Sequence, residues 1–404
     1  MTDRTGHDST SEPHRNSVLF VSGMDLTGHS GGHIATREIV GAFARHPAVD
    51  LSLVCPEPAD GGTLPFDESL RERWFLPPKP EDRPGVAGTL RTLGWHGETQ
   101  LTTAWRLWQA HRAVDPDIVV ARVGPSSVTT PVASVLTRTP YAALVRGMVG
   151  RNITFGRVAE QVVRLNSLAA DDVYVAYEEI KSQVDSYRLG SQSPAVVFPN
   201  GVDPELFQPM ERERAMAELA IELPPDAFTV GFVGSLKQRH CVAELIRAAT
   251  TLDDERDVHL LIVGEGPQRA ELEDLAVELG IADRVTFTGY VAHDELSPYI
   301  ARCDAMYGVV DSDNPSNPIK CYEYLACERP VITSNTAELA FVEREQLGVT
   351  IDRSEPADIA AAIRTLADKS SGDRAAMGAR GRDYVAENHT WDALADIIVR
   401  ELGD

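Results

Sequence analysis

The chain has 404 residues, of which 43% are hydrophobic and 25% are charged. This length and composition predict a globular protein of two or three domains and exclude a disordered chain. The 38 basic and 61 acidic side chains give a formal net charge of −23, which argues against nucleic-acid binding because contacts to phosphates need a basic surface.

The N-terminal sequence and the cysteines argue against a secreted, a membrane-spanning and a disulfide-rich protein. Residues 1–16 are polar and have no apolar segment of the kind found in signal peptides, so we expect a tail without fixed structure. No apolar run approaches the roughly 20 residues that span a bilayer. The five cysteines lack CxxC spacing, which predicts reduced, buried thiols in a cytoplasmic protein rather than disulfides or a zinc site.

The first half of the chain alternates strands and helices. Residues 17–22 read as a buried strand, 23–33 as a glycine-rich loop, 34–45 as a helix and 51–56 as a second strand. This order is typical of a doubly wound parallel sheet. Further strands of this half are expected at 117–122, 141–147 and 172–177.

A boundary rich in proline at 194–209 precedes a second α/β half. Strands are expected at 228–236, 259–267, 284–291, 304–310 and 329–334, and helices at 241–250, 270–280, 319–327 and 391–402. We therefore predict two Rossmann-like domains, at 17–190 and 191–385, with a C-terminal helix in 386–404 packing back on the first domain. The hinge is expected near 195–205, and the default ligand site is the cleft between the carboxyl ends of the two sets of strands.

The first candidate site is the glycine-rich loop at residues 28–33, which follows a strand and opens a helix. Gly31 and Gly32 let the backbone approach a ligand, and the free N–H groups of the helix favour an anion. The alternative is an ordinary tight turn between strand and helix.

The second candidate is the loop at residues 234–240, again between a strand and a helix. Lys237 and Arg239, with His240 as a third donor, would make a cradle for a diphosphate. The alternative is solvated surface charge, but the chain has only five lysines, which makes this cluster less expected by chance.

The third candidate is residues 314–326, a loop with two prolines that runs into a helix. Lys320 and Glu323 lie one turn apart on the same face of that helix. The lysine would bind phosphate and the carboxylate would accept hydrogen bonds from the hydroxyls of a ribose. The alternative is an ion pair on a surface helix.

Taken together, these segments resemble glycosyltransferase family 4, retaining enzymes with the GT-B fold of two Rossmann-like domains. The matching segments occur in the family's order and spacing and lie at 30–45, 199–207, 233–249, 260–273, 285–291, 319–334 and 389–402. The resemblance implies that the first domain binds the acceptor and the second binds a nucleotide-sugar donor, such as a UDP- or GDP-sugar.

The resemblance also implies roles for individual residues. The catalytic residues would be Lys237, Arg239, Lys320 and Glu323. The three cations would stabilise the departing diphosphate, and Glu323 would hold the ribose. Donor-binding groups would be Gly31, Gly32, Ser235, His240, Gly264, Gly266, Gly289, Tyr290, Val291, Ser316, Asn317, Pro318 and Ile319. Gly289, Tyr290 and Val291 would line the nucleobase through their backbone.

The chain departs from the family pattern at two places. Pro315 stands where the family has the first of two paired glutamates, and the backbone around 316–318 is expected to hold the donor sugar instead. Ser235 and His240 stand where the family has an arginine and a lysine, and Lys237 and Arg239 would substitute for them. His240 would donate a hydrogen bond, either protonated or neutral.

The expected mechanism is front-face transfer with retention, in which the departing phosphate accepts the proton of the acceptor. No cofactor and no metal are expected, since Asp311 and Asp313 lie in a loop that this family does not use for metal. Arg146 stands where several relatives have a histidine and is expected to contact a sugar or phosphate on the acceptor side. The alternatives are a nucleotide-sugar epimerase on the same fold and a nucleotide-sugar-binding protein without activity.

The acceptor is expected to be a glycan, a lipid-linked sugar or a cell-surface polymer. Residues 91–112 carry three tryptophans, Trp95, Trp105 and Trp108, among arginines, which would suit peripheral contact with a membrane. The alternative is a helix whose tryptophans pack on the sheet. Residues 1–190 have a net charge of −3 and residues 191–404 of −20, whereas residues 86–166 have a net charge of +5.

Overall fold

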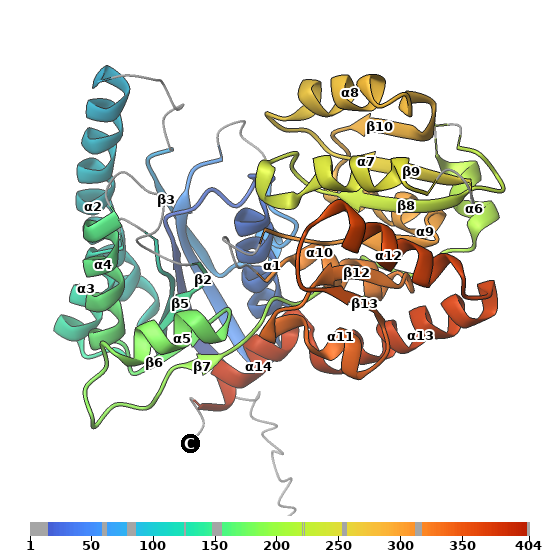
Figure 1. The fold of residues 1–404 in the computed structure, drawn as a ribbon. Coiled ribbons are helices and arrows are strands. Elements are labelled where there is room, and N and C mark those ends of the chain that lie inside the picture. The colour runs from blue at the N-terminus through green and yellow to red at the C-terminus, as the bar shows by residue number, and fades with distance from the viewer. Residues whose placement is uncertain are drawn as a thin grey trace, which may run out of the picture.

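The computed structural model describes residues 15–58, 63–78, 86–124, 127–147, 156–219, 221, 223–252, 257–311 and 317–401. These residues form two parallel sheets, each covered by helices on both faces (Figure 1). The predicted α/β class and the two Rossmann-like domains are confirmed. The N-terminal tail lies almost wholly outside the described residues.

The N-terminal sheet has the strand order β3-β2-β1-β4-β5-β6-β7. Its strands are β1 (Asn16–Ser22), β2 (Val49–Pro56), β3 (Glu72–Leu76), β4 (Ile118–Arg122), β5 (Tyr141–Val145), β6 (Asp172–Val175) and β7 (Val196–Val197). Its helices are α1 (Gly31–Arg45), α2 (Val86–Val114), α3 (Thr129–Thr137), α4 (Gly156–Ala169) and α5 (Glu178–Asp185).

The C-terminal sheet has the order β10-β9-β8-β11-β12-β13. Its strands are β8 (Phe228–Val233), β9 (Val258–Val263), β10 (Val285–Gly289), β11 (Ala305–Tyr307), β12 (Val331–Ser334) and β13 (Gly348–Ile351). The helices of this half are α6 (Arg212–Glu218), α7 (Val242–Thr250), α8 (Arg269–Glu278), α9 (Ser297–Arg302), α10 (Ile319–Ala326), α11 (Phe341–Arg344), α12 (Pro356–Ala367), α13 (Ser371–Asn388) and α14 (Trp391–Glu401).

Each sheet separates two apolar cores, because successive side chains of a strand point to opposite faces. In β1, Val18 and Phe20 pack toward α1, whereas Leu19 and Val21 pack toward α2. Strands covered on both faces are apolar throughout, which explains why the central strands could be recognised as short hydrophobic runs. The five cysteines are buried and free, as predicted.

Three edge strands were not predicted from the sequence. β3 and β13 are only partly buried, so they lack a continuous apolar run, and β7 has only two residues. β7 pairs with β6. The N-terminal sheet therefore extends past residue 190, the predicted end of the first domain. The predicted strand at 172–177 is thus followed by one more strand of the same sheet.

The C-terminal helix α14 lies against α1 of the N-terminal domain (Figure 1). Trp391, Leu394 and Ile398 are buried in the same core as Phe43. The chain thus crosses between the domains a second time, beside the first crossing, where Val202 N–H donates to the His389 carbonyl at 2.9 Å.

Candidate functional site

A cleft of about 1310 Å³ lies between the two domains. Its N-terminal wall is formed by the start of α1 and the ends of β4 and β5. Its C-terminal wall is formed by the loops after β8, β9 and β10 and by the start of α10. Carboxyl ends of parallel strands meet here, so the cleft is where the strand order predicts a ligand.

Lys320 is the most unusual side chain in this cleft. It lies in the first turn of α10, and its Nζ is buried and sits 3.9 Å from the centroid of the Phe232 ring. Among the residues that the structure describes, this Nζ has no hydrogen-bond partner. Burial and the charge of Arg239 lower its pKa to about 7. A buried ammonium group without an acceptor is costly, so this site is suited to receive an anion.

The loop after β8 supplies the neighbouring donors. Burial, together with the charges of Lys320, Arg239 and Lys237, lowers the pKa of His240 to about 2, so its imidazole is neutral. Arg239 Nε donates to His240 Nε2 at 3.4 Å, which leaves Nδ1 with the proton; this atom is buried and unpartnered. Of the two states expected for His240, the neutral one is therefore present.

The structure brings Ser235, Arg239 and His240 to the lining of the cleft but not Lys237. Lys237 is exposed and precedes a short 3-10 helix at Gln238–His240. It acts on His240 through its charge rather than facing the cleft.

The glycine loops of the C-terminal wall touch one another. Gly264 has φ +136°, and a Cβ there would lie 2.0 Å from the Gly234 carbonyl oxygen. Its N–H donates to the Gly289 carbonyl at 2.8 Å. Gly264 lines the cleft, whereas Gly266 and Gly289 do not; they allow the close packing that shapes it.

Glu323 is 5% exposed and lies at the floor of the cleft. Its Oε1 is 2.8 Å from His293 Nε2. Burial alone would lower the pKa of His293, but the carboxylates of Glu323 and Glu38 outweigh it and raise the pKa. This pairing replaces the Lys320–Glu323 surface ion pair that the sequence left open.

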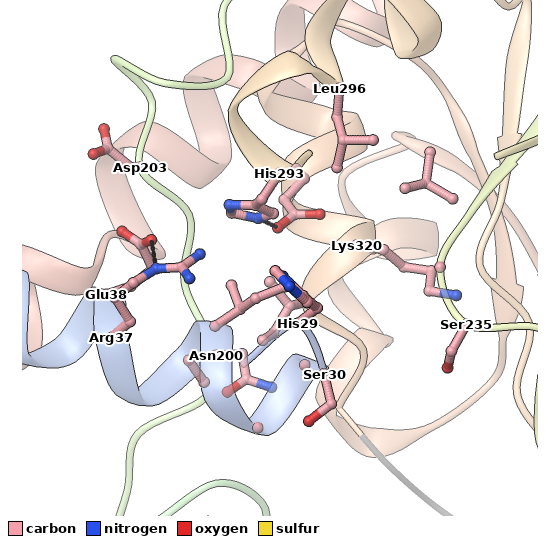
Figure 2. A pocket seen from close by; sticks show the side chains of 18 of the residues that line it. His29, Ser30, Arg37, Glu38, Asn200, Asp203, Ser235, His293, Leu296 and Lys320 are labelled. Carbon is pink, nitrogen blue, oxygen red and sulfur yellow. Dashed lines mark hydrogen bonds and ion pairs between the residues drawn. The ribbon is translucent and has the colours of Figure 1, made fainter. Parts of the chain in front are cut away.

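Figure 2 shows Glu38 and Arg37 on α1 facing His293 across the cleft. Burial raises the pKa of Glu38. His293, Glu38 and Arg37 were not predicted from the sequence. The only sequence signal for His293 is its position, four residues beyond the glycine that ends β10. This position is at the carboxyl edge of the sheet, where ligands of parallel sheets bind.

Arg146 connects the N-terminal wall to the segment just before α10. Its guanidinium donates to the Phe198 carbonyl at 2.5 Å and to Asn200 Oδ1 at 2.6 Å. Asn200 Nδ2 in turn donates to the Asn317 carbonyl at 2.5 Å. Arg146 and Asn317 both line the cleft. The hydrogen bonds of Asn200, in the first crossing between the domains, link the two residues.

Several further predicted residues meet at the cleft. Gly31 and Gly32 begin α1, whose N-cap Ser30 makes no side-chain capping bond and whose first turn has no acidic residue. The Tyr290 side chain is 54% exposed, and its hydroxyl lies 2.9 Å from His29 Nδ1, which bridges the two walls. The remaining predicted residues in the lining are Val291, Pro318 and Ile319.

Ser316 and Pro315 lie outside the described residues, as does Asp313. Among the residues that the structure describes, no group of three or more histidine, cysteine, aspartate or glutamate side chains could hold a metal ion. In the same part of the chain, no helix is long and apolar enough to cross a membrane.

Comparison with known proteins identifies the C-terminal half. Residues 227–369 match the family model of Glycosyl transferases group 1. These residues are a group 1 glycosyltransferase domain. The family resemblance inferred from the sequence is confirmed for this domain, which carries Lys320, Glu323 and the loop after β8.

Curated relatives of this chain are named glycosyltransferases. A D-inositol 3-phosphate glycosyltransferase of Stackebrandtia nassauensis is 32% identical over 237 residues, which cover 56% of this chain and 52% of the relative. The lipopolysaccharide core biosynthesis glycosyltransferase LpsD of Rhizobium meliloti is 30% identical over 182 residues, which cover 45% and 51%. The chain thus spans about half the length of these relatives.

Solved structures match the whole fold around the glycosyltransferase domain. Sucrose-phosphate synthase of Thermosynechococcus elongatus superposes with a TM-score of 0.73 at 21% identity, over 96% of this chain and 98% of that one. Anabaena HepE in complex with UDP and glucose superposes with a TM-score of 0.71 at 18% identity, over 96% and 100%. The chain has the GT-B fold, and none of these proteins is named an epimerase.

Proposed function

We propose that the protein is a retaining glycosyltransferase that moves a hexose-type sugar from a UDP- or GDP-sugar to a glycan or lipid-linked acceptor. The observation that carries the proposal is the buried, unpartnered Nζ of Lys320 beside the loop after β8, with Glu323 one turn further along α10. This pairing offers a cation to a diphosphate and a carboxylate to a ribose.

The reaction needs stabilisation of the negative charge that develops on the departing diphosphate. Lys320, Arg239 and the neutral His240 would donate to it from the C-terminal wall, and the start of α1 would add backbone dipoles from the other wall. The departing phosphate would accept the proton of the acceptor hydroxyl. The names of the relatives and the UDP bound to HepE support this reading.

The proposal is tested by measuring binding and turnover of a panel of UDP- and GDP-sugars with the full chain. We expect at least one nucleotide sugar to bind, to be hydrolysed slowly without acceptor and to give a product of retained configuration by NMR. Inverted configuration would contradict the retaining mechanism. Binding without turnover on any acceptor tested would instead support the inactive binding protein.

The role of Glu323 has a more specific test. A carboxylate that holds the ribose should favour a nucleoside diphosphate over its 2′-deoxy analogue by about tenfold, because one charge-assisted hydrogen bond is lost. Glu323→Gln should remove most of that preference, whereas the exposed Glu278→Gln should keep it. A variant at Glu323 that discriminates as well as the natural protein would refute this role.

We also propose that the N-terminal domain contacts an anionic membrane through α2 and α3, which pack against each other. Trp105 and Trp108 stack at 4.8 Å and are about half exposed, whereas Trp95 is buried and donates to the Pro77 carbonyl. The Arg112 guanidinium lies 5.0 Å from the Trp108 ring. Other exposed apolar side chains on these two helices are Leu101, Val132, Val135 and Leu136.

Exposed tryptophans beside a cation suit the interface of a bilayer with anionic lipids. Co-sedimentation with vesicles of phosphatidylglycerol should be strong, and binding to neutral phosphatidylcholine vesicles should be weak. Replacing Trp105 and Trp108 by serine should abolish binding to the phosphatidylglycerol vesicles. A Trp74→Ser variant, on the edge strand β3, should bind them as the natural protein does. Equal binding of both proteins would contradict the proposed face.

A further inference from the structure

Two arginines lie side by side in the N-terminal wall of the cleft. Arg122 ends β4, and Arg146 follows the last residue of β5. Arg122 pairs with Leu144, two residues before Arg146, so the period of a strand places both side chains on the same face of the sheet. Both line the cleft, and the charge of Arg122 lowers the pKa of Arg146, which reflects their proximity.

Among the described residues, these guanidinium groups donate hydrogen bonds only to neutral groups. Arg122 donates to the carbonyl of its neighbour Val123 at 2.9 Å, and Arg146 donates to the Phe198 carbonyl and the Asn200 amide oxygen. The Nε of each arginine is shielded from solvent and has no hydrogen-bond partner within the described ranges. No ion pair with a carboxylate involves either residue in that part of the chain.

Burial lowers the pKa of Arg122 to about 10 and, with the charge of Arg122, that of Arg146 to about 9. Two adjacent, partly buried cations repel each other, and among the described residues they lack the counter-charge that normally accompanies buried charges. A purely structural role would be served by neutral donors. The pair therefore fits a site whose counter-charge arrives with a ligand.

This pair of arginines lies on the wall of the cleft opposite to the groups assigned to the donor diphosphate. Lys320 and His240 belong to the C-terminal wall, whereas the arginines belong to the N-terminal wall. The chain of hydrogen bonds from Arg146 through Asn200 to Asn317 joins the two walls. A substrate that reaches from one wall to the other would present its diphosphate to one set of cations and a second group to the other.

We propose that Arg122 and Arg146 form a second anion-binding subsite, which takes a phosphate or carboxylate of the substrates other than the diphosphate of the donor. The inference rests on the proposed glycosyl transfer and deepens it: either the acceptor carries a phosphate or the transferred sugar carries a carboxylate. Planar guanidinium groups recognise both oxyanions through paired N–H donors.

Inorganic phosphate is the probe for the subsite. Phosphate is titrated calorimetrically into the full chain, both free and saturated with UDP or GDP, against potassium chloride of matched ionic strength. We expect phosphate to bind the nucleotide-saturated protein, and Arg122→Gln to weaken this binding by about tenfold or more, as loss of a charge-assisted contact predicts. Arg164→Gln, an exposed arginine on α4 outside the cleft, should bind phosphate as the natural protein does.

Arg122→Gln is the preferred variant because Arg146 also holds the crossing between the domains. Its fold is checked by an unchanged affinity for the nucleoside diphosphate. The proposal is overturned if the nucleotide-saturated natural protein takes up no phosphate, or if Arg122→Gln takes it up equally well. Failure of every nucleotide to bind would instead overturn the proposed function. The subsite would still be established in that case if the free protein binds phosphate and Arg122→Gln does not.

Two further comparisons identify the source of the anion. If the donor supplies it, UDP-glucuronate should bind more tightly than UDP-glucose in the natural protein and equally in Arg122→Gln. If the acceptor supplies it, glycerol 3-phosphate should bind the nucleotide-saturated protein more tightly than glycerol, again only with Arg122 present. Absence of both preferences would overturn the assignment to a substrate.

Discussion

Lys320 is the side chain whose environment differs most from what its residue type prefers. Its ammonium group is buried against Phe232 without an acceptor. Lys320→Met keeps the aliphatic stem and removes the charge. We expect kcat to fall by about 100-fold, or about 2.7 kcal/mol, because one stabilising contact to the leaving group is lost.

The Lys320 prediction is checked by steady-state kinetics and by nucleotide affinity. The variant should bind the nucleoside diphosphate more weakly but bind the nucleoside alone as well as the natural protein does. Lys369→Met, at a lysine outside the cleft lining, is the matched control. Equal loss of affinity for nucleoside and nucleoside diphosphate would show that the substitution damages the pocket rather than a phosphate contact.

The lowered pKa of Lys320 also predicts a proton uptake. With a pKa of about 7 in the free protein, the amine is mostly uncharged one pH unit higher, and a bound diphosphate would raise that pKa and restore the proton. Binding at about pH 8 should therefore take up about 0.9 proton, and affinity should fall as pH rises from about 7 to about 9.

This uptake is measured by calorimetry in buffers of different ionisation enthalpy. Lys320→Met should abolish it. His240 should contribute nothing near this pH, because its pKa is far lower. Proton release, or uptake that persists in the variant, would contradict the assignment of the titrating group to Lys320.

Individual residues were only partly predictable. Lys320, Glu323 and Ser235 could be found because each lies at the carboxyl end of a recognisable strand or in a helix just after such an end. His293 and Arg122 could not, because their role depends on a neighbour far away in sequence: Glu323 for the first and Arg146 for the second. Lys237 was expected at the cleft, but the 3-10 turn leaves it exposed.

Helix α14 belongs in sequence to the end of the chain and in space to the N-terminal core. Trp391 is 2% exposed within that core. Trp391→Ala should lower the free energy of unfolding by about 3 kcal/mol, as expected for truncation of a large buried aromatic. Trp105→Ala, at a tryptophan that is 54% exposed, should cost less than about 0.5 kcal/mol.

These two tryptophan variants are compared by urea denaturation monitored by circular dichroism. A two-domain chain can unfold in more than one step, and the loss should fall on the transition of the N-terminal domain. A destabilisation confined to the glycosyltransferase domain, or equal for both variants, would show that α14 does not stabilise the N-terminal core.

Central strands were predictable and edge strands were not. β1, β8 and β9 are buried on both faces and read as apolar runs. β3 has the sequence ERWFL with mostly exposed or partly buried positions, which a sequence reading does not separate from a loop. The predicted order of elements therefore held, while the number of strands was too low.

At the scale of the whole molecule, charge is unevenly distributed. Residues 191–404 carry a net charge of −20, although they hold the proposed diphosphate site. Long-range repulsion should slow the approach of an anionic donor, whereas Lys320 acts only at short range. Raising the ionic strength from about 10 mM to about 150 mM shortens the Debye length from about 30 Å to about 8 Å and screens that repulsion.

We therefore expect the association rate of a nucleoside diphosphate to increase with added salt. The rate is measured by stopped-flow fluorescence with an N-methylanthraniloyl-labelled nucleotide. The uncharged labelled nucleoside is the control, and its rate should not respond to salt. A rate that falls with salt would mean that the cations lining the cleft dominate the field that the ligand meets.

The two crossings between the domains run beside each other. Val202 N–H bonds to the His389 carbonyl, Val202 also forms a parallel bridge with Thr390, and a Cβ on Gly201 would lie 3.0 Å from the His389 carbonyl oxygen. Two segments fixed to each other cannot slide independently, but both can twist together. A change in the relative orientation of the two domains, and with it in the distance between Lys320 and Arg146, therefore has to move both crossings together.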